Sequence, residues 1–161
     1  MYLDALSFLE DERDMFRAYE ALDALTDEQL DVPVDAANGW SGRDLMGHMV
    51  VWQEAALATA RELAMGETSP TIDRLDAEWE VPGAGDRMNA EAIERFRAMP
   101  MAEVRRQFRE TAGELRGYLT VVPESRWIKH AKHQEWFFGE TIEHYEDHSK
   151  ELRAILEAAG R

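Results

Sequence analysis

Two histidines near the C-terminus, His144 and His148, stand four residues apart in the stretch GETIEHYEDHSKEL. Residues four apart in an α-helix lie nearly above one another, so the two imidazoles are predicted to point the same way. Their helical face also carries the apolar residues Ile142, Tyr145 and Leu152, which indicates that this face turns toward a core. The pair is therefore expected either to form part of a site or to be hydrogen-bonded inside the fold.

A third histidine, His48, lies on the apolar stripe of another predicted helix, which begins at Ser41. In a bundle whose alternate helices run parallel, this helix begins at the same end as a last helix that starts near Gly139. His48 lies seven residues after Ser41, and His144 and His148 lie five and nine residues after Gly139. The three imidazoles are thus predicted to lie at one depth of the bundle.

Three neutral imidazoles at one depth could hold a divalent metal such as zinc, nickel or iron, with a position left open for water or substrate. The metal would act as a Lewis acid or lower the pKa of a bound water or thiol. Glu140, one turn before His144, is interpreted as a general base, a further ligand or a group that orients a ligand. Its position in a first helical turn also fits a purely structural role, through the helix dipole. His130 and His133, in a predicted loop, are expected to be exposed and to have no role in the site.

Hydrophobic periodicity predicts the helices that must position these residues. Apolar residues recur at steps of three and four, and no alternating strand pattern appears. The periodic regions span about residues 2–25, 41–66, 89–119 with a break before Pro100, and 139–160. Four amphipathic helices predict an all-α fold, a four-helix bundle, as a single domain over residues 1–161. The connection 67–87, with two prolines and two glycines, is predicted to be a long ordered loop whose role stays open.

Two helix starts carry explicit capping signals. In WSGRDL, Ser41 is predicted to cap the backbone amide of Asp44, while the Asp44 carboxylate reaches back to the Ser41 amide. In TDEQL, Thr26 is predicted to cap a short helical turn. The start at Ser41 is the best defined boundary in the sequence, and it fixes where His48 lies along its helix.

Composition narrows the classes of function. The 161 residues include 18 Lys and Arg against 33 Asp and Glu, a formal net charge of −15, which opposes binding to nucleic acid or to anionic lipid. The chain has no cysteine, which excludes disulfides, zinc–thiolate sites and a thiol nucleophile of its own. An acidic N-terminus and the lack of an apolar run of about 18 residues predict a cytoplasmic protein with no membrane span.

Several stretches resemble the DinB/YfiT-like superfamily. WSGRDLMGHMVVW is similar to the family's second-helix pattern, in which a tryptophan, a small capping residue and a leucine precede a histidine. ETIEHYEDHSKEL is similar to its last-helix pattern, with two histidines four apart. LTDEQLD and PESRW are similar to further family patterns, so the resemblance spans most of the chain. It implies a four-helix bundle, commonly a homodimer, with zinc or nickel bound by His48, His144 and His148.

The resemblance also implies chemistry on a small-molecule substrate. Family members include thiol-dependent isomerases and S-transferases that use low-molecular-weight thiols such as mycothiol or bacillithiol, and self-protection hydrolases of the ClbS/DfsB type. The segment AGDRMNAEAIERFRAMPMAEV is similar to the ClbS/DfsB branch, whose members need not keep the metal ligands.

A thiol-dependent transferase or isomerase acting on small electrophiles is the function that the sequence favours. The lack of cysteine agrees with a thiol brought in as cosubstrate, and equally with hydrolysis by metal-bound water. A hydrolase and a metal-free binding or sequestering protein are the alternatives. The basic residues nearest the predicted site are Arg43, Lys129 and Lys132, and their spacing does not predict that they converge around an anionic thiol.

Overall fold

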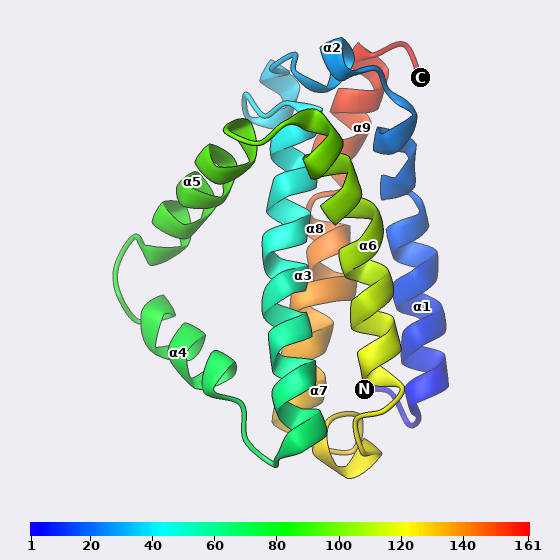
Figure 1. The fold of residues 1–161 in the computed structure, drawn as a ribbon, viewed down its shortest axis with the longest axis vertical. Coiled ribbons are helices and arrows are strands. Elements are labelled where there is room, and N and C mark those ends of the chain that lie inside the picture. Colours follow the sequence, from blue (N-terminus) through cyan, green and yellow to red (C-terminus); the bar gives the residue numbers. More distant parts are fainter.

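The computed structural model describes residues 1–161 and consists of helices joined by short turns, with no strand. Four long helical segments lie side by side along the long axis of the molecule (Figure 1). Three are single helices: α1 (Ala5–Arg17), α3 (Gly42–Met65) and α6 (Met101–Leu119). The fourth, the C-terminal segment, consists of α7 (Ala131–Phe138), a π-helical turn (Gly139–Glu143), α8 (His144–Asp147) and α9 (Ser149–Ala158). The remaining elements are α2 (Asp27–Leu30), α4 (Pro70–Trp79), α5 (Ala84–Arg97) and three short 3-10 helices (Tyr19–Ala24, Asp35–Ala37 and Glu124–Arg126). The predicted all-α fold is confirmed. None of the helices combines the length and the apolar character that a membrane crossing requires.

Helix α3 begins where the sequence predicts. The Ser41 hydroxyl accepts a hydrogen bond from the Asp44 amide, and the Asp44 carboxylate accepts one from the Ser41 amide, which together form a capping box. Both Asp44 oxygens also accept hydrogen bonds of 2.8 Å from Arg97, so the start of α3 is tied to the end of α5. Thr26 caps α2 as predicted, and the Gln29 side chain completes a second capping box there.

The prediction of a loop over residues 67–87 is wrong, because α4 and the start of α5 occupy this stretch. The side chain of Ser69 accepts a hydrogen bond from the Ile72 amide, and Pro70 occupies the first turn of α4, where its missing N–H and fixed φ are favourable. Helix α5 begins at Ala84, five residues before the predicted start at Asn89. In Figure 1 the two helices form an arm, in green, beside α3.

Two glycines allow this arm to pack closely. A Cβ atom on Gly47, in α3, would overlap the ring of Phe96 from α5. A Cβ atom on Gly85, at the start of α5, would overlap the ring of Trp79 at the end of α4. The absence of a side chain at these positions lets α5 approach α3 next to His48 and lets α4 and α5 approach each other.

The C-terminal segment differs from its prediction in two ways. It starts at Ala131 rather than near Gly139, and it is interrupted by the π-helical turn and again at His148, where φ is −94° and ψ is 6°. The prediction of one regular helix over residues 139–160 is therefore wrong, although the turn from His144 to His148 is α-helical as predicted, with the His148 amide donating to the His144 carbonyl oxygen (3.2 Å). Helix α1 is also shorter than predicted, because the chain after Arg17 tightens into the 3-10 helix Tyr19–Ala24.

The prediction of an exposed loop holds for His130, which is exposed and lies outside the helix, and is wrong for His133, which lies in α7. His130 caps α7, where its Nδ1 atom accepts a hydrogen bond from the His133 amide. The His133 side chain is buried, and its Nδ1 atom lies 2.5 Å from the carbonyl oxygen of Arg126. Both histidines thus hold the start of α7, which explains their presence without a role in chemistry.

The core between the long helices consists of two apolar clusters, and α3 contributes to both. Fully burying one of their large side chains stabilises the fold by about 1.5–3 kcal/mol. A buried polar group, the tyrosine network, crosses the core: the Tyr145 hydroxyl donates to Glu12 Oε1 (2.9 Å) and accepts from Gln53 Nε2 (2.9 Å), and Arg116 Nη1 donates to Glu12 Oε2 (2.8 Å). This network links α1, α3, α6 and α8, and it fixes the position of α8, in which His144 precedes Tyr145.

Candidate metal centre

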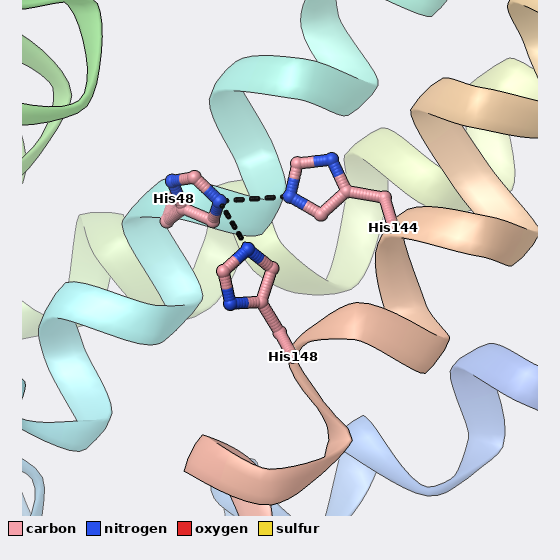
Figure 2. A group of neighbouring side chains, drawn as sticks. All are labelled: His48, His144 and His148. Carbon is pink, nitrogen blue, oxygen red and sulfur yellow. Dashed lines mark hydrogen bonds between the residues drawn. The ribbon is translucent and has the colours of Figure 1, made fainter. Parts of the chain in front are cut away.

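Three histidines from three positions of the fold meet beside α3 (Figure 2). His48 comes from α3, His144 is the first residue of α8, and His148 lies at the junction of α8 and α9. The Nε2 atom of His48 lies 2.7 Å from His144 Nε2 and 3.0 Å from His148 Nε2. One ring nitrogen of each histidine lies within 4.8 Å of the others. The structure therefore brings together the three histidines that the sequence singles out, which we call the histidine cluster.

The irregular winding of the C-terminal segment aims two of these rings. A π-helical turn contains one residue more per turn than the α-helical register allows, and such turns are frequent at functional sites. Here the turn directly precedes His144, and the non-helical dihedral angles of His148 change the course of the chain four residues later. Both imidazoles point at His48, one from each end of the single α-helical turn α8.

Two tryptophans enclose the histidine cluster. The Trp40 ring stacks on His148 with centroids 5.4 Å apart and an interplanar angle of 23°, and it lies 4.8 Å from the His48 ring. The Trp52 ring lies 6.1 Å from the His144 ring. This apolar wall leaves His48 only 2% exposed.

Burial keeps the histidine cluster uncharged. Desolvation, with the neighbouring imidazoles as the second cause, lowers the pKa of His48 to about 2 and that of His144 to about 3. Desolvation also lowers the pKa of His148, against the opposing effect of Glu151 and Asp147. Since metal ligation requires neutral imidazole, the rings are in the right protonation state at neutral pH.

A carboxylate supports the third histidine from behind. Glu151 Oε2 lies 3.6 Å from His148 Nδ1, the ring nitrogen that faces away from His48. The other oxygen of Glu151 accepts a hydrogen bond of 2.8 Å from Asn38. At this distance the two atoms form no hydrogen bond, and neither has another partner. A carboxylate that hydrogen-bonds to this nitrogen orients a histidine ligand and raises its basicity, and Glu151 is placed to do so after a small shift. Sequence reasoning missed Glu151, although its spacing of three residues from His148 is the signal for such a pair.

A cavity of about 340 Å³ opens beside the histidine cluster. Its lining combines the three histidines with two aromatic, four polar or acidic residues and a glycine: Trp52, Trp79, Asn89, Glu140, Glu143, Asp147 and Gly139. Glu140 is thus next to the histidines, and burial raises the pKa of its carboxyl to about 7. Trp79 comes from α4, so the mistaken loop prediction concealed its position, whereas Asn89, in α5, is predicted from the sequence as a helix start without a role in the site.

The basic residues considered from the sequence lie elsewhere. Each is joined to an acid outside the cavity: Arg43 to Asp31 (2.6 Å), Lys129 to Glu124 (2.5 Å) and Lys132 to Asp76 (2.9 Å). No lysine or arginine side chain lines the cavity beside the histidine cluster. The site therefore presents no cationic side chain to a ligand.

The chemistry of the histidine cluster fits a divalent metal ion. The Nε2 atom of a neutral imidazole carries either one proton or one lone pair, so it makes one good hydrogen bond. His48 Nε2 nevertheless lies within hydrogen-bond distance of two other Nε2 atoms. A cation between the three rings would use all three lone pairs at once, and three histidines are a ligand set that zinc and nickel accept.

Comparison with known proteins identifies a family for this chain. The sequence pattern of the DinB superfamily matches residues 9–152, which include all three histidines and most of the chain. Searches of curated proteins and of solved structures find no significant match. The match covers α3, the arm and the histidine-bearing turn of the C-terminal segment, and it shows that this chain belongs to the DinB superfamily.

Proposed function

We propose that the protein is a metal-dependent enzyme built as a single DinB-like four-helix-bundle domain over residues 1–161, with His48, His144 and His148 as ligands of zinc or nickel. One observation carries the proposal: His48 Nε2 lies 2.7 and 3.0 Å from the other two Nε2 atoms, an arrangement that hydrogen bonds between neutral imidazoles do not satisfy. When bound, the ion supplies Lewis acidity and lowers the pKa of a water or thiol that binds beside it.

Glu140 is proposed as the general base. Its carboxyl lines the cavity with the histidines, and burial raises its pKa to about 7. A base with a pKa near the working pH transfers protons most effectively, because it is ionised and still basic enough to accept a proton. Glu140 would accept the proton of the attacking nucleophile and return it to the leaving group.

Hydrolysis of a small labile ester or ring is our first choice of reaction. The cavity has no lysine or arginine, whereas an anionic low-molecular-weight thiol needs a cationic partner in its site. The lining of the cavity therefore favours hydrolysis over thiol-dependent transfer, whereas the sequence favours thiol-dependent transfer. Thiol-dependent transfer or isomerisation, which the resemblance implies, is the second choice and uses the same ligands and the same base. We further propose that the protein forms a homodimer, which analytical ultracentrifugation tests.

The deciding experiment measures metal content by elemental mass spectrometry on untagged protein. We expect about one ion per chain in the parent and near none in His148→Ala. His130→Ala is the matched control, since His130 is a histidine outside the cluster and its loss should leave the ion bound. A parent that takes up no ion after incubation with zinc or nickel would overturn the metalloenzyme and leave a metal-free binding protein.

Activity then separates the two reactions. Metal-loaded protein is tested on ester and lactone panels with and without added thiols, beside Glu140→Gln. The Glu140→Gln variant should keep the ion but lose about 100-fold or more in rate, the usual contribution of a general base. A rate that depends on thiol would favour transfer over hydrolysis.

A further inference from the structure

The cavity beside the histidine cluster has an unbalanced charge. Three carboxylates line it, those of Glu140, Glu143 and Asp147, and none of them forms an ion pair. An acid just outside the cavity shows the contrast: Glu54 accepts two hydrogen bonds, of 2.7 and 2.9 Å, from Arg95. The protein thus neutralises a neighbouring acid with an arginine and leaves the acids of the cavity without a cation.

Aromatic surface adjoins these acids. Trp52 and Trp79 stack with centroids 5.9 Å apart and an interplanar angle of 22°. Trp79 is held against Gly85, yet 52% of its surface remains exposed. The exposed face of a tryptophan attracts cations by about 0.5–2 kcal/mol and offers a stacking surface for a flat ring.

A third feature points to a ligand with hydrogen-bond donors. Asn89 Oδ1 is buried and has no donor within hydrogen-bond distance, although its residue lines the same cavity. A buried acceptor without a partner costs about 1–3 kcal/mol. Asn89 Oδ1 is shielded from solvent in this structure, so a ligand N–H group recovers this cost once the Asn89 side chain turns toward the cavity. The oxygens of Asn89, Glu143 and Asp147 are all acceptors.

From these observations we infer that the cavity takes a small organic cation, an ammonium or amidinium group joined to a flat apolar ring. The ring stacks on Trp79, and the cationic N–H groups face Asn89 and the carboxylates. This inference rests on the proposed function in so far as it names the substrate class for the same site. Its evidence, however, lies in the lining and not in the metal ligands, so it can be tested with and without the ion.

The test compares three probes of similar size that differ in charge: 2-phenylethylammonium, 2-phenylethanol and 3-phenylpropanoate. Binding is measured by isothermal titration calorimetry at neutral pH and physiological salt, first on metal-free protein, because a carboxylate could bind a metal directly. We expect the ammonium probe to bind about 10-fold more tightly than the alcohol, and the carboxylate to bind most weakly. The preference of ammonium over alcohol should persist in zinc-loaded protein.

Single-residue variants show which side chains of the cavity cause the preference for the ammonium probe. Trp79→Ala should weaken the ammonium probe at least about 5-fold, and Trp79→Phe should restore most of the loss. Glu143→Gln should weaken the ammonium probe and leave the alcohol unchanged. Glu157→Gln removes the same charge from an exposed position outside the cavity and should change neither.

Three outcomes would overturn the inference: no binding of the ammonium probe at millimolar concentration, equal binding of ammonium and alcohol, or equal effects of Glu143→Gln and Glu157→Gln. None of these outcomes bears on whether the ion binds, which the metal measurement decides by itself. Conversely, if the metal measurement finds that the protein takes up no ion while the ammonium probe is still preferred, the inference stands and only the metalloenzyme is refuted.

Discussion

The histidine cluster and the tyrosine network are two polar groups inside one apolar core, and they meet at the consecutive residues His144 and Tyr145. In the tyrosine network both oxygens of Glu12 and the Tyr145 hydroxyl have partners, and Glu12 is fully buried. In the histidine cluster one nitrogen of His48 is shared between two neighbours, and its other nitrogen, Nδ1, has no partner. The histidine cluster also borders a cavity.

This difference separates a structural polar group from a chemical one. A network whose charged group is fully paired joins its helices, and the unpaired atom of this network, Gln53 Oε1, is buried and does not belong to a residue that lines the cavity. A cluster with unused lone pairs beside a cavity can bind an ion at little cost to the fold. The two groups should therefore respond in opposite ways to mutation, and four measurements test this.

The largest effect is expected from Glu12→Ala. The substitution leaves Arg116 and the Tyr145 hydroxyl without their buried partner, and breaking a buried pair in this way costs about 3–5 kcal/mol of unfolding free energy. Urea unfolding of metal-free protein measures the loss. Glu10→Ala, at an exposed position of the same helix, should change stability by less than about 0.5 kcal/mol. A loss below about 1 kcal/mol for Glu12→Ala would remove the distinction between the two groups.

His48→Ala should show the opposite pattern. Without metal, we expect its unfolding free energy to stay within about 1 kcal/mol of the parent, since the imidazole lacks a full set of hydrogen bonds. Zinc at about 100 times its dissociation constant should stabilise the parent by about 2.7 kcal/mol and the variant not at all. The comparison fails if zinc stabilises both proteins equally.

A smaller effect is expected from Glu151→Gln. The change removes the charge behind His148 Nδ1 but keeps the shape of the side chain, so zinc affinity should fall about 10-fold. Competition with a chromogenic chelator measures the affinity. Glu157→Gln, on the same helix, serves as the control for net charge. An unchanged affinity in Glu151→Gln would mean that the carboxylate does not support the ligand.

The smallest effect concerns pH. Burial, opposed by Arg116, raises the pKa of Glu12 above its ordinary value of 4.5. The folded protein then binds more protons than the unfolded chain between the two values, so the contribution of Glu12 to unfolding free energy falls as the pH rises through that interval.

Glu12→Gln cannot titrate and isolates this contribution. The difference in unfolding free energy between parent and Glu12→Gln should decline with rising pH above 4.5, by at most about 1.4 kcal/mol per pH unit, and become flat above the raised pKa. Urea unfolding of metal-free protein at several pH values measures this difference. A difference that grows with pH would show that Arg116 outweighs burial.

The sequence predicts the parts of this molecule that local rules govern. The capping box at Ser41 fixes the start of α3 and hence the position of His48. The helical spacing of His144 and His148 places both near the same face, even though the helix is irregular. Ser69 and Pro70 are an equally local signal, and reading them as a helix start would have revealed α4 and with it the position of Trp79.

Other features depend on tertiary contacts that have no local signal. Nothing in the composition of Gly139–Glu143 distinguishes a π-helical turn from an α-helical one. The burial of Glu12 is an intermediate case, because it lies four residues after Phe8 and four before Phe16, and both are buried. The periodicity thus places Glu12 on the core face, but its partners, Arg116 and Tyr145, come from two other elements and require the fold.

The π-helical turn has a consequence for how this protein can evolve. A π-helical turn takes up one residue more than an α-helical turn, so deletion of one residue from it would restore regular winding and leave the following chain near its present orientation relative to α7. The same deletion in the regular part of α7 would rotate the following chain by about 100°, taking His144 out of the cavity and Tyr145 away from Glu12 in one event. Among related chains, a single-codon deletion should therefore be tolerated within Gly139–Glu143 and absent from α7.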